Sequence, residues 1–242
     1  MPEGFERTIK IVSSDCDRFQ RLRLSALFSM LQEVSIRDVE LAGVTRDRTL
    51  DKGLLWVISR MKLEMDRPIH YDETITISTS AGPRTHMVFP RYYTVKDAEG
   101  HILLKASALW LLISENTRTS INPEEEGIDI PGTEEEGRLE LPMGLRPFSC
   151  DDPSSIRTVV FSDIDLNGHV NNTRYLDWID DLFDLHFHEV TAVKKLQINY
   201  IHEVEFNDQV SVYYEYHNGK YRVDGRKDDI TVFQAEFEAM KL

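Results

Sequence analysis

The sequence is poor in cysteine and has no long hydrophobic run. Its 242 residues include only two cysteines, Cys16 and Cys150, which lie far apart, so neither a disulfide framework nor a cysteine-rich metal site is expected. No segment approaches the roughly 18 apolar residues that a membrane-spanning helix needs, and the opening residues lack the apolar core of a signal peptide. These absences predict a cytoplasmic protein with no membrane span.

Basic residues are also scarce. The chain has 28 Lys and Arg against 42 Asp and Glu, a net charge of −14. This balance argues against general nucleic-acid binding, because such binding needs clustered Lys and Arg to neutralise phosphates. Half of the net charge lies between residues 124 and 140, where eight acids accompany one base, Arg138. The rest of the surface can therefore still carry basic patches.

Several familiar catalytic and cofactor motifs are missing. The sequence contains no Gly-x-Ser-x-Gly nucleophile motif, no P-loop and no dinucleotide-binding fingerprint. Four histidines follow one another closely in the second half, but none has the spacing of a common metal site. They are His169, His186, His188 and His202. We therefore expect neither a metal nor a cofactor.

The hydrophobic pattern predicts two similar series of elements. A composition of 41% hydrophobic and 29% charged residues is ordinary for a globular protein. The first series is a strand at residues 8–12, a helix at 24–41 stopped by Gly43, and strands at 54–63, 74–80, 87–95 and 102–113. The second is a strand at 156–161, a helix ending near Asp184, and strands at 193–201, 209–217, 220–226 and 230–240.

The two series are also similar in sequence. A shift of 148 positions aligns residues 14–17 (SDCD) with 162–165 (SDID), and a shift of 136 aligns residues 71–75 with 207–211. We therefore predict an α+β fold with two related halves, each a long helix wrapped by an antiparallel sheet. The predicted domains are residues 1–115 and 156–242, joined by an acidic, proline-rich linker at 116–155.

Polar side chains are concentrated before the second predicted helix. They alternate along the chain at Asp163, Asp165, Asn167 and His169. In an extended backbone all four would share one face. Asn171 or Asn172 is expected to cap the helix, and free backbone N–H groups at residues 170–172 would suit a developing negative charge. An Asp-x-Asp pair before a helix is usually turn chemistry, and Asp163 is expected to be structural.

This stretch resembles a known family. Residues 165–172 (DLNGHVNN) and residues 54–62 (LLWVISRMK) in the first half are similar to the plant-type acyl-acyl carrier protein thioesterases, which are tandem hot-dog proteins. The resemblance implies a tandem hot-dog fold with an acyl pocket in the first half. It also implies four catalytic residues, the last of which lies 34 positions after His169 in a YIHE sequence. They are Asp165, Asn167, His169 and Glu203.

Two departures from the family pattern bear on the nucleophile and on the type of family member that we expect. Plant members often have Cys after the catalytic Glu, but Val204 occupies that position here, so a thiol nucleophile at this point is excluded. The chain also begins close to its first predicted strand, without the transit peptide of plastid relatives. A bacterial-type cytoplasmic enzyme fits this pattern better.

Thioester hydrolysis needs an activated water or nucleophile, a group that handles protons, and donors for the oxyanion. Glu203 or Asp165 could accept the proton, His169 could orient or transfer it, and Asn167 could fix the water or the carboxylate. Backbone N–H groups at residues 170–172 could form the oxyanion site. The sequence leaves open which carboxylate is the base and whether one attacks directly.

The resemblance predicts hydrolysis of fatty acyl-acyl carrier protein to free fatty acid and carrier protein, which would end chain elongation. An acyl-CoA thioesterase on the same fold and a non-catalytic acyl-binding module are the alternatives. Acyl carrier proteins are acidic, so docking on basic residues is expected, and a homodimer is compatible with the resemblance. The candidate docking residues are Arg18, Arg21, Arg23, Lys194 and Lys195. Phe19 and Arg21 replace Asn167 and His169 in the first half, so we expect one active centre, with Phe19 influencing chain length.

Overall fold

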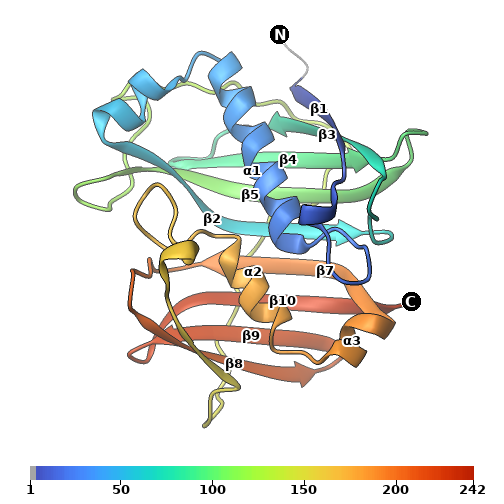
Figure 1. Ribbon diagram of the computed structural model, residues 1–242. Helices are drawn as coiled ribbons and strands as arrows, with labels where there is room; N and C mark the ends of the chain where they lie inside the picture. Colours follow the sequence, from blue (N-terminus) through green and yellow to red (C-terminus); the bar gives the residue numbers. More distant parts are fainter. Residues whose placement is uncertain (1–3) are drawn as a thin grey trace.

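The computed structural model describes residues 4–242 and is built around one ten-stranded antiparallel sheet (Figure 1). The strands of the first half are β1 Phe5–Lys10, β2 Leu54–Met65, β3 Thr74–Ala81, β4 Val88–Lys96 and β5 Ile102–Ser114. Those of the second half are β6 Ser155–Thr158, β7 Thr191–Tyr200, β8 Gln209–His217, β9 Lys220–Lys227 and β10 Ile230–Lys241. The helices are α1 Leu24–Leu41, α2 Arg174–Asp180 and α3 Leu185–Val190. None of the helices in the described part of the chain is long and apolar enough to cross a membrane.

The sheet consists of two five-stranded halves with the same internal order. The strand order is β1-β3-β4-β5-β2 in the first half and β7-β10-β9-β8-β6 in the second, so β2 and β7 meet at the centre. Their antiparallel pairing joins Arg60 to Asn199 and Glu64 to Lys195. All three α-helices cover the same side of the sheet (Figure 1). The predicted α+β class is confirmed.

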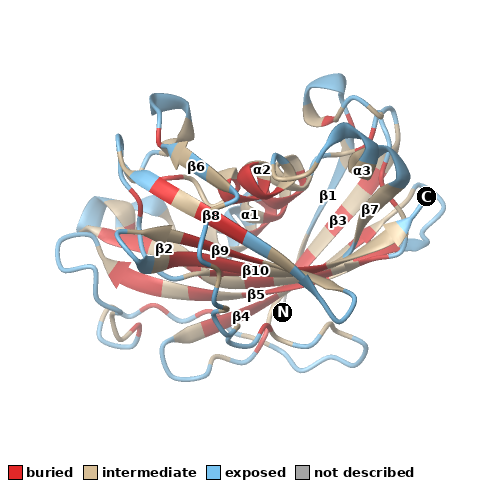
Figure 2. Cartoon of the chain, turned by 90° about the horizontal axis from the view of Figure 1, so that it is seen from below, coloured by how far each residue is buried: buried red, intermediate tan, exposed pale blue. Residues whose placement is uncertain are grey.

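The first-half helix forms as the sequence predicts. Apolar side chains at helical spacing, Leu27, Phe28, Leu31 and Val34, are all buried. Burial of each such side chain contributes roughly 1.5–3 kcal/mol, and Figure 2 shows the buried residues concentrated where the helices meet the sheet. The helix stops before Gly43, whose φ of +85° is in the left-handed region.

The second-half helix is not the single long helix that we predict from sequence. α2 has only seven residues, and a separate helix, α3, begins at Leu185. The Asp184 side chain accepts a hydrogen bond from the backbone N–H of Phe187 at 2.8 Å and so caps α3. Asp181 also places negative charge at the carboxyl end of α2, which is unfavourable for continuing the helix. The expectation of one helix ending near Asp184 is therefore wrong.

The internal repeat is present, with one correction to its register. At a shift of 148, the Asp17 N–H bonds the Arg21 carbonyl at 2.7 Å, and the Asp165 N–H bonds the His169 carbonyl at 2.9 Å.

The second shift is 135 rather than 136. The Ile11 N–H bonds the Glu73 carbonyl, and the corresponding Val159 N–H bonds the Asp208 carbonyl. Only this shift places Ile75, which is fully buried, on fully buried Val210. Burial sets the register because a slip of one residue would move every side chain of the strand to the other face.

The acidic segment between the halves packs against the sheet. On β5, the side chains of Lys105 and Ser107 donate hydrogen bonds to the carbonyls of Gly137 (2.6 Å) and Glu140 (2.7 Å). Alternate residues of a strand point to opposite faces, so these contacts lie on the face away from Trp110, which bonds the Tyr93 hydroxyl beneath α1. The segment therefore covers the sheet face that the helices leave open.

Candidate functional site

The polar stretch before α2 forms a tight turn with Asn167 near its tip. The Asp165 carboxylate accepts a hydrogen bond from the Asn167 N–H at 2.8 Å, and the Gly168 N–H bonds the Asp165 carbonyl at 3.1 Å. Gly168 has a φ of +83°, which glycine adopts without the strain of a side chain. The extended backbone that would place four polar side chains on one face is therefore wrong, because Asp and Gly form a turn here.

Asp163 and Asp165 both hold backbone in place. The Asp163 carboxylate accepts the Val160 N–H at 3.0 Å, so the structural role expected for Asp163 is confirmed. The Asp165 contact recurs in the first half, where the Asp17 carboxylate accepts the Phe19 N–H at 2.8 Å. The carboxylate of Asp165 thus makes a turn contact that both halves share.

His169 and Glu203 are brought together from separate segments. Nε2 of His169 lies 3.4 Å from Oε2 of Glu203 and 3.9 Å from Oε1 of Glu205. Glu203 follows the end of β7, in a segment held by the bond from the Val170 N–H to the Val204 carbonyl at 2.9 Å. The sequence-predicted pair is therefore adjacent, although no β-strand carries either residue.

An arginine that the sequence analysis does not single out completes this cluster. Arg118, in the turn after β5, donates a hydrogen bond from Nη1 to Oε1 of Glu203 at 3.2 Å. The Nδ1 atom of His169 is buried and has no hydrogen-bond partner among residues 4–242. Such unsatisfied buried groups are rare and call for a functional or structural explanation. Arg118 lies 85 positions before Glu203, so no local pattern could have indicated it.

The turn at Asn167 lines an apolar cavity of about 190 Å³. Leu166 and Asn167 come from the second half, whereas most of the lining comes from the first half. The apolar walls include Val39, Val44, Trp56, Phe89, Trp110 and Ile130. No hydrogen bond engages the Asn167 side chain within the described part of the chain. An unoccupied amide beside an apolar cavity can orient a polar group whose chain lies in the cavity.

The backbone donors expected near residue 170 are largely occupied. The Val170 N–H bonds the Val204 carbonyl, and the Asn171 N–H bonds the Asp163 carbonyl at 2.8 Å. The expectation that these two groups face a reacting oxygen is therefore wrong. The Asn171 side chain accepts the Thr173 N–H at 2.9 Å, so it caps the turn that precedes α2 and not the helix itself. The Val170 N–H has no partner within its own loop, so only the pairing with the distant Val204 shows that it is occupied.

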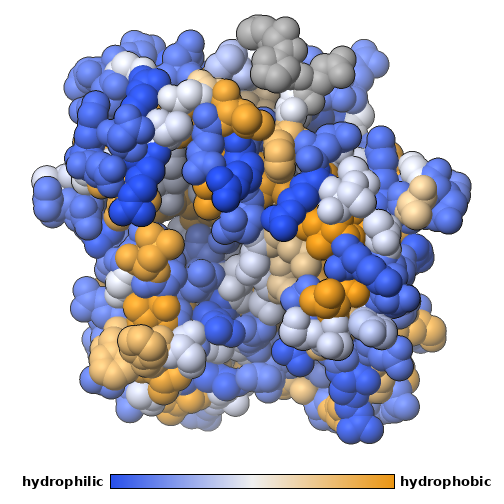
Figure 3. Space-filling model, turned by 45° about the horizontal axis from the view of Figure 1, so that its top comes forward, coloured by the Kyte–Doolittle hydropathy of each residue, from blue (hydrophilic) through white to orange (hydrophobic). Residues whose placement is uncertain are grey.

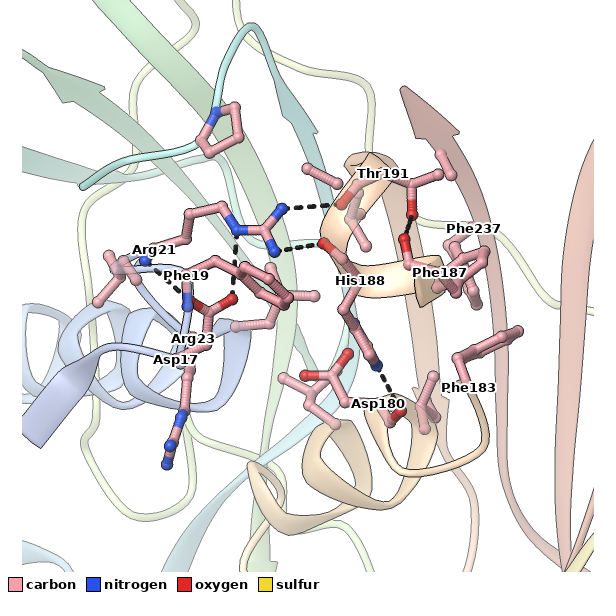
Figure 4. Close-up of a pocket in the computed structure, with 18 of the residues that line it drawn as sticks. Asp17, Phe19, Arg21, Arg23, Asp180, Phe183, Phe187, His188, Thr191 and Phe237 are labelled. Carbon is pink, nitrogen blue, oxygen red and sulfur yellow. Dashed lines mark hydrogen bonds and ion pairs between the residues drawn. The ribbon is translucent and has the colours of Figure 1, made fainter. Parts of the chain in front are cut away.

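A second pocket, of about 560 Å³, contains the first-half counterpart of the site (Figure 4). Phe19 and Arg21, the counterparts of Asn167 and His169, both line it. The Arg21 guanidinium donates to the carbonyls of Thr191 (2.9 Å) and His188, and its Nε lies 3.3 Å from Asp17.

Two expectations for this region are corrected by the pocket. Phe19 does not line the cavity at Asn167, so it cannot set chain length there. Arg21 is only 7% exposed, which removes it from any docking surface. Each half thus places its polar turn against the helix of the other half.

Asp180 is the unusual acid of this second pocket. Burial, followed by the nearby charges of Asp177 and Asp181, raises the pKa of its carboxyl to about 7. Its backbone carbonyl contacts Nε2 of His188 at 2.9 Å, as Figure 4 shows.

Aromatic residues after the motif belong to the core. Tyr175 is 3% exposed and Trp178 is 5% exposed, and their rings pack edge to face with centroids 5.0 Å apart. Burial also raises the pKa of the Tyr175 hydroxyl. Both side chains are therefore part of the hydrophobic core.

Two family models match the chain over most of its length. Residues 2–130 match the acyl-ACP thioesterase N-terminal domain, and residues 152–238 match the acyl-ACP thioesterase C-terminal domain. The protein therefore belongs to the acyl-ACP thioesterase family, and the resemblance seen in its motifs is confirmed.

Individual relatives support this assignment. The chain is 26% identical over 190 residues to the chloroplastic palmitoyl-acyl carrier protein thioesterase of Cuphea hookeriana, covering 72% of this chain and 46% of that protein. It is also 26% identical over 207 residues to the chloroplastic dodecanoyl-[acyl-carrier-protein] hydrolase of Cinnamomum camphora, covering 76% of this chain and 54% of that protein. The chain spans about half the length of these curated relatives.

Solved structures show the same fold. An acyl-ACP thioesterase from Bacteroides thetaiotaomicron superposes with a TM-score of 0.85 at 22% identity, covering 98% of this chain and 97% of that one. The 12:0-ACP thioesterase from Umbellularia californica gives a TM-score of 0.80 at 19% identity, again covering 98% and 97%. The predicted tandem hot-dog arrangement is confirmed, apart from the divided helix of the second half.

Proposed function

We propose that the protein is a thioester hydrolase that releases fatty acids from acyl carrier protein and so ends chain elongation. The observation that carries this proposal is the position of Asn167, in the lining of an apolar cavity and two residues before His169, which lies beside Glu203. An acyl chain in the cavity would bring its thioester carbonyl to the Asn167 amide. The proton-handling pair would then be close to the carbonyl carbon.

We assign separate roles in hydrolysis to Asn167, His169 and Glu203. The Asn167 side-chain amide donates to the carbonyl oxygen as it gains negative charge, because the nearby backbone N–H groups of Val170 and Asn171 are occupied. His169 and Glu203 orient a water molecule and accept its proton as the oxygen attacks the carbonyl carbon. The C–S bond then breaks, the proton passes to the leaving sulfur, and free acid and thiol are released.

In this scheme Asp165 has a different role from Glu203. Its carboxylate already accepts the Asn167 N–H, and the same contact exists in the half that lacks the amide and imidazole. This repetition supports Asp165 as the residue that holds the turn bearing Asn167. Glu203 contacts His169 directly, which supports it as the proton acceptor of the pair.

The names of the relatives support acyl carrier protein as the carrier. The test is to offer the purified protein matched acyl-carrier protein and acyl-CoA series and to measure free acid and thiol. Faster turnover of the carrier-protein series is expected. Faster turnover of acyl-CoA would instead favour the acyl-CoA thioesterase, and binding without release of thiol would favour a non-catalytic acyl-binding module.

The assembly and location of the protein stay predictions. A cytoplasmic homodimer is the form that we propose for further study, on the basis of the sequence analysis above. Light scattering coupled to size-exclusion chromatography would measure the mass in solution, and a monomer would contradict the dimer.

A further inference from the structure

We infer that Arg118 is a positioning residue for catalysis, which orients the Glu203 carboxylate toward His169. This inference rests on the proposed function, because it assigns Arg118 a task within the same site. It also adds a residue from the turn after β5 to the active centre.

The two oxygens of Glu203 are engaged by different partners. Oε1 accepts the hydrogen bond from Arg118 at 3.2 Å, and Oε2 lies 3.4 Å from Nε2 of His169. Glu203 lies outside the strands, and its side chain is 40% exposed. A carboxylate in such a segment can rotate freely unless a second contact fixes its plane. Arg118 provides that contact, so Oε2 stays directed at the imidazole.

The backbone at Arg118 indicates that this position is constrained. Arg118 has a φ of +54°, in the left-handed region that favours Gly and Asn over long side chains. The turn itself is held by the bonds from the Arg118 N–H to the Ser114 carbonyl (2.9 Å) and from the Ser114 N–H to the Thr119 carbonyl (3.0 Å). Glycine would satisfy such a turn with less strain. An arginine in this conformation therefore favours a function for its side chain.

The charges around His169 also favour a positioning role for Arg118. Two carboxylates, Glu203 and Glu205, approach the same nitrogen of the ring at 3.4 and 3.9 Å. Arg118 bonds only the nearer of them. It thereby distinguishes Glu203 from Glu205 and offsets one of the two negative charges beside the imidazole.

Stability is a weaker explanation for the ion pair. The side chains of Arg118 and Glu203 are 34% and 40% exposed, and ion pairs at such exposure contribute little to folding. The loss of Arg118 should therefore reduce turnover much more than it reduces thermal stability.

A double-mutant cycle tests this inference. Arg118→Ala should lower kcat roughly 10- to 100-fold with little change in KM, because a misplaced catalytic group costs about this much. Arg118→Lys should restore part of the loss, since it keeps the charge but not the planar donor geometry. In a Glu203→Gln background, Arg118→Ala should have almost no further effect on kcat, because Arg118 acts through that carboxylate.

Arg84→Ala is the matched control. Arg84 makes a similar ion pair with an exposed acid, Glu124, in a part of the surface with no proposed catalytic role, and its loss should leave kcat unchanged. Independent, additive losses for Arg118→Ala and Glu203→Gln would overturn the positioning role. If the wild-type protein hydrolyses no acyl thioester, the proposed function itself fails, which is a different outcome from a normal kcat for Arg118→Ala.

Discussion

Asn167 lines an apolar cavity, and two residues further along the chain is His169, which lies beside Glu203. Its backbone N–H donates to the Asp165 carboxylate at 2.8 Å, and its carboxamide makes no hydrogen bond within residues 4–242. This arrangement leaves the amide donor available to a ligand. The turn fixes the backbone that carries this donor, which limits the reorganisation needed when charge develops on a carbonyl oxygen.

Replacement of this amide should abolish most of the activity. For Asn167→Ala we expect kcat to fall by about 10²- to 10³-fold on every acyl chain length, the usual cost of losing one oxyanion donor. The matched control is Phe19→Ala, at the corresponding position of the other turn, which should keep normal turnover. Steady-state kinetics with several chain lengths measure both variants. A folded Asn167→Ala protein with normal kcat would remove Asn167 from the mechanism.

Glu203 can be tested with a nearly isosteric change. Glu203→Gln keeps the size of the side chain but removes the base, so kcat should fall by about 10²-fold or more while the melting temperature changes little. Glu205→Gln is the comparison, because Glu205 is further from His169 and its side chain is 70% exposed. A smaller loss is expected for Glu205→Gln. Equal losses for the two variants would show that the imidazole does not discriminate between the two acids.

At the scale of elements, the division of the second helix affects the lining of the second pocket. α2 stops at Asp180, and α3 starts under the cap of Asp184. The gap brings Phe183 and Phe187 to the wall of the second pocket, as Figure 4 shows. The first half has an uninterrupted α1 instead, which explains why its cavity differs in size and lining.

The raised pKa of Asp180 predicts a pH-dependent stability. Between pH 3.8, where the unfolded carboxyl ionises, and about 7, the folded protein binds more protons than the unfolded chain. Stability therefore falls as pH rises through this interval, and the full penalty remains above about pH 7. Asp180→Asn should remove it and stabilise the protein by about 1–2 kcal/mol at pH 8, a value reduced for partial exposure, with little gain at pH 4.

Thermal or urea unfolding at pH 4 and pH 8 measures this difference. Asp72→Asn is the control, because that side chain is 64% exposed and lies 2.8 Å from Lys10, and Asp72 is not among the charges that raise the pKa of Asp180. It should not gain stability at pH 8. An equal gain for Asp180→Asn at both pH values would contradict the titration and indicate a simple packing effect.

At the scale of the whole molecule, the two halves are interlocked through their turns. The second half places Asn167 against the first-half cavity, and the first half places Phe19 against the second-half pocket. Only the former has an amide and an imidazole on its turn. One active centre per chain stays a prediction, and it rests on this difference between the two turns.

Carrier docking should depend on charge near the functional cavity. Charged and polar side chains dominate the face in Figure 3, with separate apolar clusters between them. Arg46 lines the cavity at Asn167, and its side chain is 74% exposed. Arg18 lines the second pocket and is also exposed. We therefore predict that docking depends on Arg46, at the cavity beside Asn167, and not on Arg18 at the second pocket.

Charge reversal at Arg46 and at Arg18 tests which of the two pockets the carrier protein docks beside. Arg46→Glu should lower kcat/KM on acyl-carrier protein by about tenfold at low salt, because an acidic partner is steered by charge, whereas Arg18→Glu should change it little. Rising salt should reduce kcat/KM of the wild-type protein and shrink the difference between the variants. A larger effect of Arg18→Glu would move the docking site to the second pocket.

The sequence by itself determined the features that depend on neighbouring residues. The apolar stripe of α1, the succession of strands along the chain and the structural role of Asp163 are all local, whereas the extended backbone expected at residues 165–169 is a turn in the structure. The family motif also identified Asn167, His169 and Glu203 as one set, although their catalytic roles stay predictions.

Only the tertiary structure decided which of these groups meet. The β2–β7 seam sets the two halves side by side, and the contact between Arg118 and Glu203 joins residues 85 positions apart. Tertiary packing also places the turn of each half in a pocket lined by the helix of the other half. Hydrogen bonds to Val204 and Asp163 occupy the backbone donors of Val170 and Asn171, and the second helix is divided into α2 and α3. These outcomes depend on burial and on hydrogen bonds between distant segments, and no local periodicity records such pairings.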